Sequence, residues 1–223
     1  MAVLPASPLT ALSPLDGRYH AHTAPLAPYF SEFGLLHYRV RVEVEYFIAL
    51  CGLGLPQLTS VGESDYPALR RLWQDFSVAD AERIKQLERT TNHDVKAVEY
   101  WLKERFQHCG LGKVVEFIHF GLTSQDINNT AQPLALREAL QSVLLPAYDA
   151  VLDDIQHLAE AWLGVPLLAR THGQPASPTL LGRELLVFVE RLMGQLDAAR
   201  GVRHSAKFGG ATGGFNAHHA AYP

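Results

Sequence analysis

A helical pattern that runs for about 40 residues, from Thr123 to Gly164, constrains the fold more than any other feature of this 223-residue sequence. At ~1.5 Å per residue such a helix would span about 60 Å. Only Pro133 and Pro146 interrupt it, and Pro133 should kink it or open a hydrogen bond. Its apolar stripe consists of Leu134, Leu140, Leu144, Val151, Leu152, Ile155 and Leu158. One chain cannot cover this stripe, so we expect a bundle that extends between subunits and an isolated chain that oligomerises.

Helical periodicity dominates the rest of the chain as well. After an irregular, proline-rich lead-in at residues 1–28, apolar residues recur at steps of three and four from Ser31 until Gly52. Ser77 and Asp80 have the spacing of a capping box that opens another helix, and further helices are predicted over about 92–108 and 177–202. The sequence therefore predicts an all-α fold, with a helical N-terminal domain at residues 1–112 and the first part of a helical bundle at residues 113–223.

Composition excludes several classes of function. The chain is 48% hydrophobic and 19% charged with a net charge of -4 and has no basic block, which argues against nucleic-acid binding. Cys51 and Cys109 have neither disulfide nor metal spacing, which predicts a reduced, cytoplasmic protein without a metal site. No apolar run approaches the ~18 residues of a membrane helix, and the N-terminus lacks a secretory signal. Walker, Rossmann, zinc and nucleophile-elbow motifs are absent, and no cofactor is predicted.

Two polar segments lie at predicted helix starts. Residues 90–94 read Thr-Thr-Asn-His-Asp: they form either a simple N-cap, with Thr or Asn as the acceptor, or an anion site to which His93 contributes a hydrogen bond. Residues 123–129 read Thr-Ser-Gln-Asp-Ile-Asn-Asn, in which Thr123 and Asp126 form a capping box. This segment is more polar than a cap requires, so either a carboxylated ligand or neighbouring helices should pair with it.

A third polar segment, residues 170–176, reads Arg-Thr-His-Gly-Gln-Pro-Ala. Gly173 and Pro175 impose a non-helical backbone, so His172 should be held on a rigid turn. Histidine has a side chain suited to general acid catalysis near neutral pH, although a turn histidine that bonds its own backbone is the alternative. Among the other histidines, His119 lies between apolar residues and is expected in the core, whereas the sequence does not decide the role of His218.

Six segments taken together resemble the fumarase/aspartase superfamily and, within it, the bacterial adenylosuccinate lyases. They are the three polar segments, extended at the first to residues 88–99, together with residues 13–19 (Ser-Pro-Leu-Asp-Gly-Arg-Tyr), 116–120 (Glu-Phe-Ile-His-Phe) and 215–218 (Phe-Asn-Ala-His). The resemblance covers essentially the whole chain. It implies a homotetrameric lyase that eliminates fumarate from adenylosuccinate, giving AMP, and from a succinylated carboxamide ribotide.

The resemblance also implies residue roles. Arg18 and Tyr19 would contact the nucleotide, with Arg18 at its phosphate. Asn92, His93, Asp94 and Thr171 would bind substrate, with His93 also counted as catalytic, while Thr123 and Ser124 would hold a succinyl carboxylate and His172 would be the general acid. Gln125 stands where relatives commonly have an acidic residue. The family's basic serine, on a Ser-Ser-x-Met-Pro-x-Lys loop, has no match in these 223 residues, so we expect this polypeptide alone to be inactive.

Two alternatives remain. Another superfamily enzyme, such as argininosuccinate lyase, fumarase or aspartase, would keep the Thr-Ser and Thr-His segments but lack the Asp-Gly-Arg-Tyr nucleotide contact. A non-catalytic helical assembly module could keep a degenerate pocket, although retention of all three polar segments argues against it. In either case the expected partners are small molecules and other copies of the chain, with no membrane.

Overall fold

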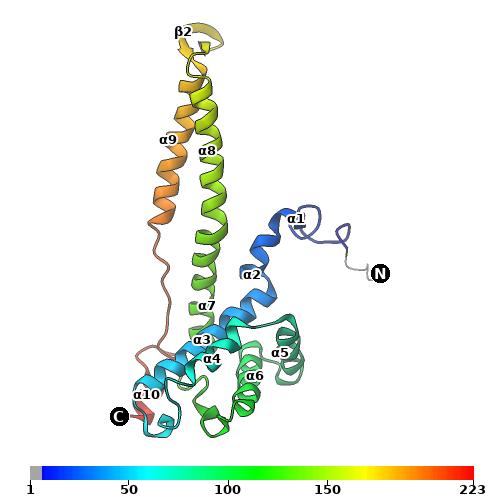
Figure 1. The fold of residues 1–223 in the computed structure, drawn as a ribbon, viewed down its shortest axis with the longest axis vertical. Helices are drawn as coiled ribbons and strands as arrows, with labels where there is room; N and C mark the ends of the chain where they lie inside the picture. Colours follow the sequence, from blue (N-terminus) through cyan, green and yellow to red (C-terminus); the bar gives the residue numbers. More distant parts are fainter. Residues whose placement is uncertain (1–6) are drawn as a thin grey trace. The chain divides into compact units, whose positions relative to one another are not determined.

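The computed structural model describes residues 7–223, which divide into two compact units. Unit 1 contains the chain up to Arg137 together with His204–Pro223, and unit 2 contains Glu138–Arg203. Figure 1 traces the helices that make up most of both units. The predicted boundary at residue 112 falls inside unit 1, and the division of the complete protein into domains there remains a prediction.

Unit 1 is built from α-helices and short 3-10 turns. Its elements are α1 (His20–Thr23), η1 (Ala24–Leu26), α2 (Ala27–Phe30), α3 (Glu32–Gly52), η2 (Pro56–Leu58), α4 (Tyr66–Gln74), α5 (Val78–Thr91), α6 (Asp94–His108), η3 (Gly112–Phe117), α7 (Ser124–Ala139, whose last two residues belong to unit 2) and α10 (Asn216–Ala221). Two helix starts agree with the sequence analysis. The Ser31 side chain accepts from the Gly34 amide at the start of α3, and Ser77 and Asp80 form the predicted capping box of α5.

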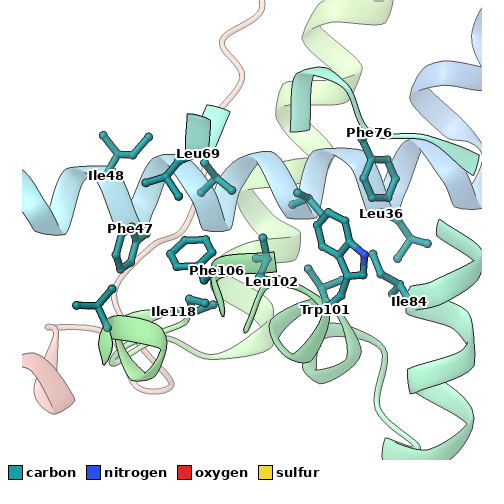
Figure 2. Packing of buried hydrophobic residues seen from close by; sticks show 14 of the residues in the cluster. Leu36, Phe47, Ile48, Leu69, Phe76, Ile84, Trp101, Leu102, Phe106 and Ile118 are labelled. Atoms are coloured by element: carbon teal, nitrogen blue, oxygen red, sulfur yellow. The ribbon is translucent and has the colours of Figure 1, made fainter. Parts of the chain in front are cut away.

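The core of unit 1 lies along α3. Figure 2 shows side chains from α3, α4, α5 and α6 meeting there. The Trp101 and Phe106 side chains are at most 1% exposed, and their rings pack edge-on against Phe76 and Phe47, with centroids 5.5 and 4.8 Å apart. Such edge-to-face pairs add to the stabilisation from burial alone. A second cluster, consisting of Tyr38, Val42, Val95, Ile127, Ala131 and Ala135, packs α3, α6 and α7 together.

Unit 2 is a pair of helices whose connection forms a β-hairpin. Its elements are η4 (Leu140–Leu144), α8 (Leu145–Ala161), β1 (Pro166–Thr171), β2 (Gln174–Leu180) and α9 (Leu181–Arg200). Helices α8 and α9 lie side by side (Figure 1) and approach closely at Gly182, where an added Cβ would collide with the Ala159 carbonyl oxygen. Many apolar side chains of this unit stay exposed, among them Val151, Leu158, Trp162, Leu186, Phe188 and Met193.

The all-α fold class is confirmed, but the sequence analysis missed the hairpin and placed a helix from Ser177. Residues 174–180 instead form β2, which pairs antiparallel with β1, and α9 begins at Leu181. The physical reason is that Pro175 and Pro178 cannot donate helical hydrogen bonds, and the residue before each proline prefers extended backbone.

The predicted long helix is present, and Pro133, which has no amide hydrogen to donate, opens one helical hydrogen bond as predicted, but the change of helix type lies elsewhere. This proline lies within α7, and the regular α-helix gives way instead to a π-helical turn, η4, shortly before Pro146. A π turn directs each carbonyl to the amide five residues on. In η4 the Leu145 amide donates to the Leu140 carbonyl, one residue before Pro146, which has no amide hydrogen to donate. Within residues 7–223, none of the helices combines the length and apolar character needed to cross a bilayer.

Candidate active site

The starts of α6 and α7 lie next to each other in unit 1 and carry most of the polar residues singled out in the sequence. His93 is the N-cap of α6, and its Nδ1 accepts a hydrogen bond of 3.2 Å from the Lys96 amide. The other ring nitrogen, Nε2, lies 3.4 Å from the Oγ of Ser124, the first residue of α7. The fold thus joins two of the predicted site residues, which are 31 positions apart in the sequence.

The cap at this helix start differs from the expected one. Thr91 and Asn92 do not cap α6: Asn92 ends α5 in the left-handed conformation, with φ 51°, and Thr91 Oγ1 donates to the His93 carbonyl. Asparagine is one of the few residues that adopt this conformation readily. The sharp turn at Asn92 brings the imidazole of His93, in place of a Thr or Asn oxygen, over the free amides of α6.

A buried arginine fixes the two helix starts to each other. Arg39 of α3 is 4% exposed; its Nη2 lies 2.6 Å from Asp94 Oδ2, and its Nε donates to Asn128 Oδ1 over 2.9 Å. Burial opposes ionisation of Asp94, but a hydrogen bond from the Val95 amide and the charge of Arg39 hold the pKa of this carboxyl below its ordinary value. The sequence analysis missed Arg39. Its position in the apolar stripe of α3, one turn before Glu43, could have indicated that the Arg39 side chain is buried. Glu43 is buried as well.

Asp126 joins the start of α7 to the glycine-rich segment near the C-terminus. Its side chain is fully buried and accepts from the amides of Thr123 (2.8 Å), Gly209 (2.9 Å) and Gly210 (3.1 Å), and from Lys207 Nζ (2.7 Å). Burial would raise the pKa of Asp126, but these donors hold it below the ordinary value. The bond to Thr123 is one half of the expected capping box. Neighbouring chain segments therefore satisfy Asp126, which leaves the adjacent hydroxyls as the groups that a ligand could reach.

A surface hollow lies beside His93. Its lining consists of Lys85, Glu88, Arg89, Asn92, His93 and Asp94. Lys85 Nζ is paired with Glu32 (2.9 Å) and with Glu88 (2.5 Å). The sequence analysis did not predict Lys85 or Arg89; both belong to the last turns of α5, which places two cations beside the cap of α6. The hollow thus holds two cations, Lys85 and Arg89, and two carboxylates, Glu88 and Asp94.

Arg18 and Tyr19 lie in the lead-in before α1. The Arg18 guanidinium is 5.4 Å from the centroid of the Tyr19 ring, and the Tyr19 side chain is 45% exposed. The structure does not bring this pair into contact with the hollow or with Ser124 in the described part of the chain. An exposed cation stacked on a ring remains available to a phosphate.

His172 and Thr171 belong to unit 2, where they form part of the tight turn between β1 and β2. Thr171 pairs with Gln174, and the two residues between them, His172 and Gly173, have φ values of 49° and 75°. Two successive left-handed residues are the pattern of a type I′ turn. The imidazole of His172 is exposed at this tip, so the residues predicted as catalytic and as substrate-binding are divided between the two units.

Two further histidines pair with groups on α3. The Nδ1 of His119 lies 2.5 Å from the buried Oε1 of Glu43. Burial raises the pKa of the Glu43 carboxyl. Burial also disfavours the charged form of His119, but the hydrogen bond to Glu43 outweighs this effect and raises the pKa of the imidazole. The Tyr46 hydroxyl donates its hydrogen to the Phe120 carbonyl over 2.6 Å, and its oxygen lies 2.6 Å from the Nε2 of His218. Neither pair forms a metal centre, because residues 7–223 hold no group of three suitable His, Cys, Asp or Glu ligands.

The fold has known counterparts. A 3-carboxy-cis,cis-muconate lactonizing enzyme from Pseudomonas putida matches 87% of this chain and 43% of its own, with a TM-score of 0.66 and 24% identity. A fumarate lyase from Mesorhizobium sp. BNC1 matches 86% of this chain and 43% of its own, also with a TM-score of 0.66 and with 22% identity. The chain therefore shares the helical fold class of these two enzymes.

The sequence narrows this class. The family model described as Lyase matches residues 17–223, and the chain belongs to this lyase family. Among curated relatives, the adenylosuccinate lyase of Dictyostelium discoideum is 52% identical over 96% of this chain and 47% of its own length. The adenylosuccinate lyase of Escherichia coli K12 is 44% identical over 97% of this chain and 48% of its own. The chain thus spans about half the length of the curated relatives it matches.

Proposed function

We propose that this chain is the N-terminal part of an adenylosuccinate lyase, which eliminates fumarate from adenylosuccinate and from the succinyl-carboxamide ribotide of purine synthesis. The observation that carries the proposal is the pair formed by His93 and Ser124 at two adjacent helix starts, in a chain 44–52% identical to adenylosuccinate lyases. Further support comes from Arg18 and Tyr19, because an exposed guanidinium beside an aromatic ring suits the phosphate of a nucleotide.

In the proposed complex the start of α7 binds a succinyl carboxylate. The Thr123 and Ser124 hydroxyls and the free amides of the helix are donors, and the helix dipole favours negative charge at this end. Asn92, His93 and Asp94 would line the same pocket. Arg18 would bind the 5′-phosphate, for which a forked guanidinium is well shaped.

The proposed reaction is a β-elimination. A base removes a proton from the succinyl carbon next to a carboxylate, the bond between the neighbouring carbon and the 6-amino nitrogen breaks, and His172 gives a proton to the departing nitrogen. Family resemblance assigns the base to a serine outside these 223 residues. Charge that develops on the carboxylate would be stabilised by donors fixed at the start of α7. We further propose that the complete enzyme is a cytoplasmic homotetramer, which would cover the exposed apolar side chains of unit 2.

Calorimetric titration of the 223-residue chain tests this proposal. We expect adenylosuccinate to bind more tightly than argininosuccinate, because only the former has the phosphate that Arg18 would bind. Arg18→Ala should weaken binding of adenylosuccinate about 10-fold or more, whereas Arg71→Ala, which also removes an exposed cation, should have little effect. Equal affinity for the two ligands would favour another lyase of the superfamily, and binding of neither would favour a non-catalytic assembly module.

A further inference from the structure

The hydrogen bond at the start of α6 determines which nitrogen of His93 carries a proton. Nδ1 accepts from the Lys96 amide over 3.2 Å, so this nitrogen must present its lone pair. A neutral imidazole has one donor and one acceptor nitrogen. Nε2 therefore carries the hydrogen, and a further proton could enter the ring only at Nδ1, at the cost of the helix cap. The cap thus selects the tautomer in which Nδ1 accepts and Nε2 donates.

The same assignment fixes the direction of the contact with Ser124. Because Nε2 is a donor, the Ser124 Oγ that lies 3.4 Å away must accept. A serine hydroxyl has one hydrogen, which can rotate to suit its surroundings. With a lone pair of its oxygen facing His93, the hydrogen of Ser124 points away from the ring and is left for another acceptor. The hydrogen bonds therefore form a series in one direction: the Lys96 amide donates to His93 Nδ1, and His93 Nε2 donates to Ser124 Oγ.

We infer that His93 is a positioning residue, held by the α6 cap so that Nε2 donates, which directs the Ser124 hydroxyl hydrogen toward an oxygen of an anionic ligand. The ring serves as a donor and does not act as a general base. Asp94 Oδ1 also lies 3.6 Å from Nδ1, but the Lys96 amide at 3.2 Å is the closer partner and can only donate, so the tautomer follows from this bond. The nature of the ligand, a carboxylate, rests on the proposed function.

Arg39 makes this series of hydrogen bonds rigid. Its bonds to Asp94 and Asn128 hold the residue that follows His93 and a residue one turn beyond Ser124. The separation between the imidazole and the hydroxyl is therefore set by a buried side chain, although His93 itself is half exposed. A ligand would meet a preformed pair of groups, which reduces the ordering that binding requires.

Nitrogen-15 NMR of the histidine side chains tests the tautomer directly. In the 223-residue chain at about pH 8, where an ordinary imidazole is neutral, we expect the His93 signals of a protonated Nε2 and an unprotonated Nδ1. The His93→Asn variant identifies these signals by their loss among the eleven histidines. A protonated Nδ1, or the averaged signals of a ring that exchanges between tautomers, would overturn the inference.

Two substitutions separate the cap from the donor. Asparagine is among the best N-cap residues but is too short to replace Nε2, whereas glutamine carries an amide donor at about the right reach and caps poorly. With fumarate as the probe, we expect His93→Asn to keep the thermal midpoint and bind at least about 10-fold more weakly, because the Ser124 hydroxyl is no longer oriented and its hydrogen bond to the charged ligand is weakened. His93→Gln should lower the midpoint by a few degrees and bind within about three-fold of the unsubstituted chain.

The reverse pattern, with Asn binding normally and Gln failing to bind, would mean that His93 acts only as a cap and would overturn the positioning role. Ser124→Ala should weaken fumarate binding to a similar extent as His93→Asn, and the double variant should be no weaker than either single one, because the two groups act in series. If the unsubstituted chain does not bind fumarate, the proposed function fails, while the NMR result still decides the tautomer.

Discussion

Replacing Asp126 by asparagine removes one charge from the point where α7 meets the glycine-rich segment and leaves the shape of the side chain almost unchanged. In the native chain both carboxylate oxygens accept from backbone amides, and Lys207 adds a charged donor. Asparagine keeps one oxygen, and its NH₂ group would face amides that also need an acceptor. We therefore expect Asp126→Asn to destabilise unit 1.

The magnitude follows from the burial of each donor. An amide of Gly209 or Gly210 that loses its acceptor in a buried position costs ~1–3 kcal/mol. Lys207 is 41% exposed on its side chain, so water can replace its ion pair and this contact adds ~1 kcal/mol at most. The sum is a loss of about 1–4 kcal/mol. At Asp149, whose ion pair with Arg200 is exposed on both sides, the same substitution should cost under about 1 kcal/mol.

The loss of stability in Asp126→Asn can be measured by urea unfolding followed by tryptophan fluorescence. Trp162 of unit 2 is first replaced by phenylalanine, so that the signal comes only from Trp73 and Trp101 of unit 1. The folded-state pKa of Asp126 is lowered, so its contribution is present above the ordinary aspartate pKa of about 3.9 and is lost as the pH falls through the folded-state value. The stability gap between the native chain and Asp126→Asn should be constant near neutral pH and narrow in acid. A gap no larger than that of Asp149→Asn would refute the reasoning.

Other substitutions test the packing of unit 1 by the same unfolding assay. Gly121→Ala should cost about 2–4 kcal/mol, because φ is 69° and the added Cβ would lie 2.6 Å from the His218 ring; Gly54→Ala, at φ 72° with open space around it, should cost only ~1 kcal/mol. Equal losses for the two glycines would show that His218 moves aside freely. Phe47→Ala should cost ~3–5 kcal/mol by leaving a cavity against Phe106, whereas Phe30→Ala, at a side chain 53% exposed, should be nearly neutral. A small loss at Phe47 would mean that the core collapses to fill the space.

Features set by neighbours in the sequence were the ones that could be predicted. The predicted cap at Ser77 depends on an amide three residues away, and the periodic stripe that begins after Ser31 is visible in a single stretch of chain. The polar helix start at Ser124 was found for the same reason. Its partner in the fold was not, because the contact with His93 requires α6 and α7 to pack, and periodicity within one helix carries no information about that packing.

Contacts between distant segments account for most of what was missed. Asp126 receives the Gly209 amide from 83 positions away, and no local pattern indicates such a pairing. Arg39 was overlooked because arginine is almost never fully buried unless it is paired, and its partners lie in α6 and α7. The hairpin was missed for a different reason: its turn is His-Gly in place of the Asn-Gly or Asp-Gly that normally marks a type I′ turn.

The left-handed backbone at His172 limits which substitutions can test its catalytic role and which residues can occupy this position. Alanine there would remove the imidazole and also place a Cβ-bearing residue with no compensating hydrogen bond at φ 49°, at ~1 kcal/mol of strain. A loss of turnover in His172→Ala would therefore mix chemistry with distortion of the hairpin. Asparagine tolerates this conformation, so His172→Asn is the cleaner probe of the proposed general acid. For the same reason β-branched residues, which are the least tolerant of this backbone, should be excluded from the position in functional variants whatever the reaction requires.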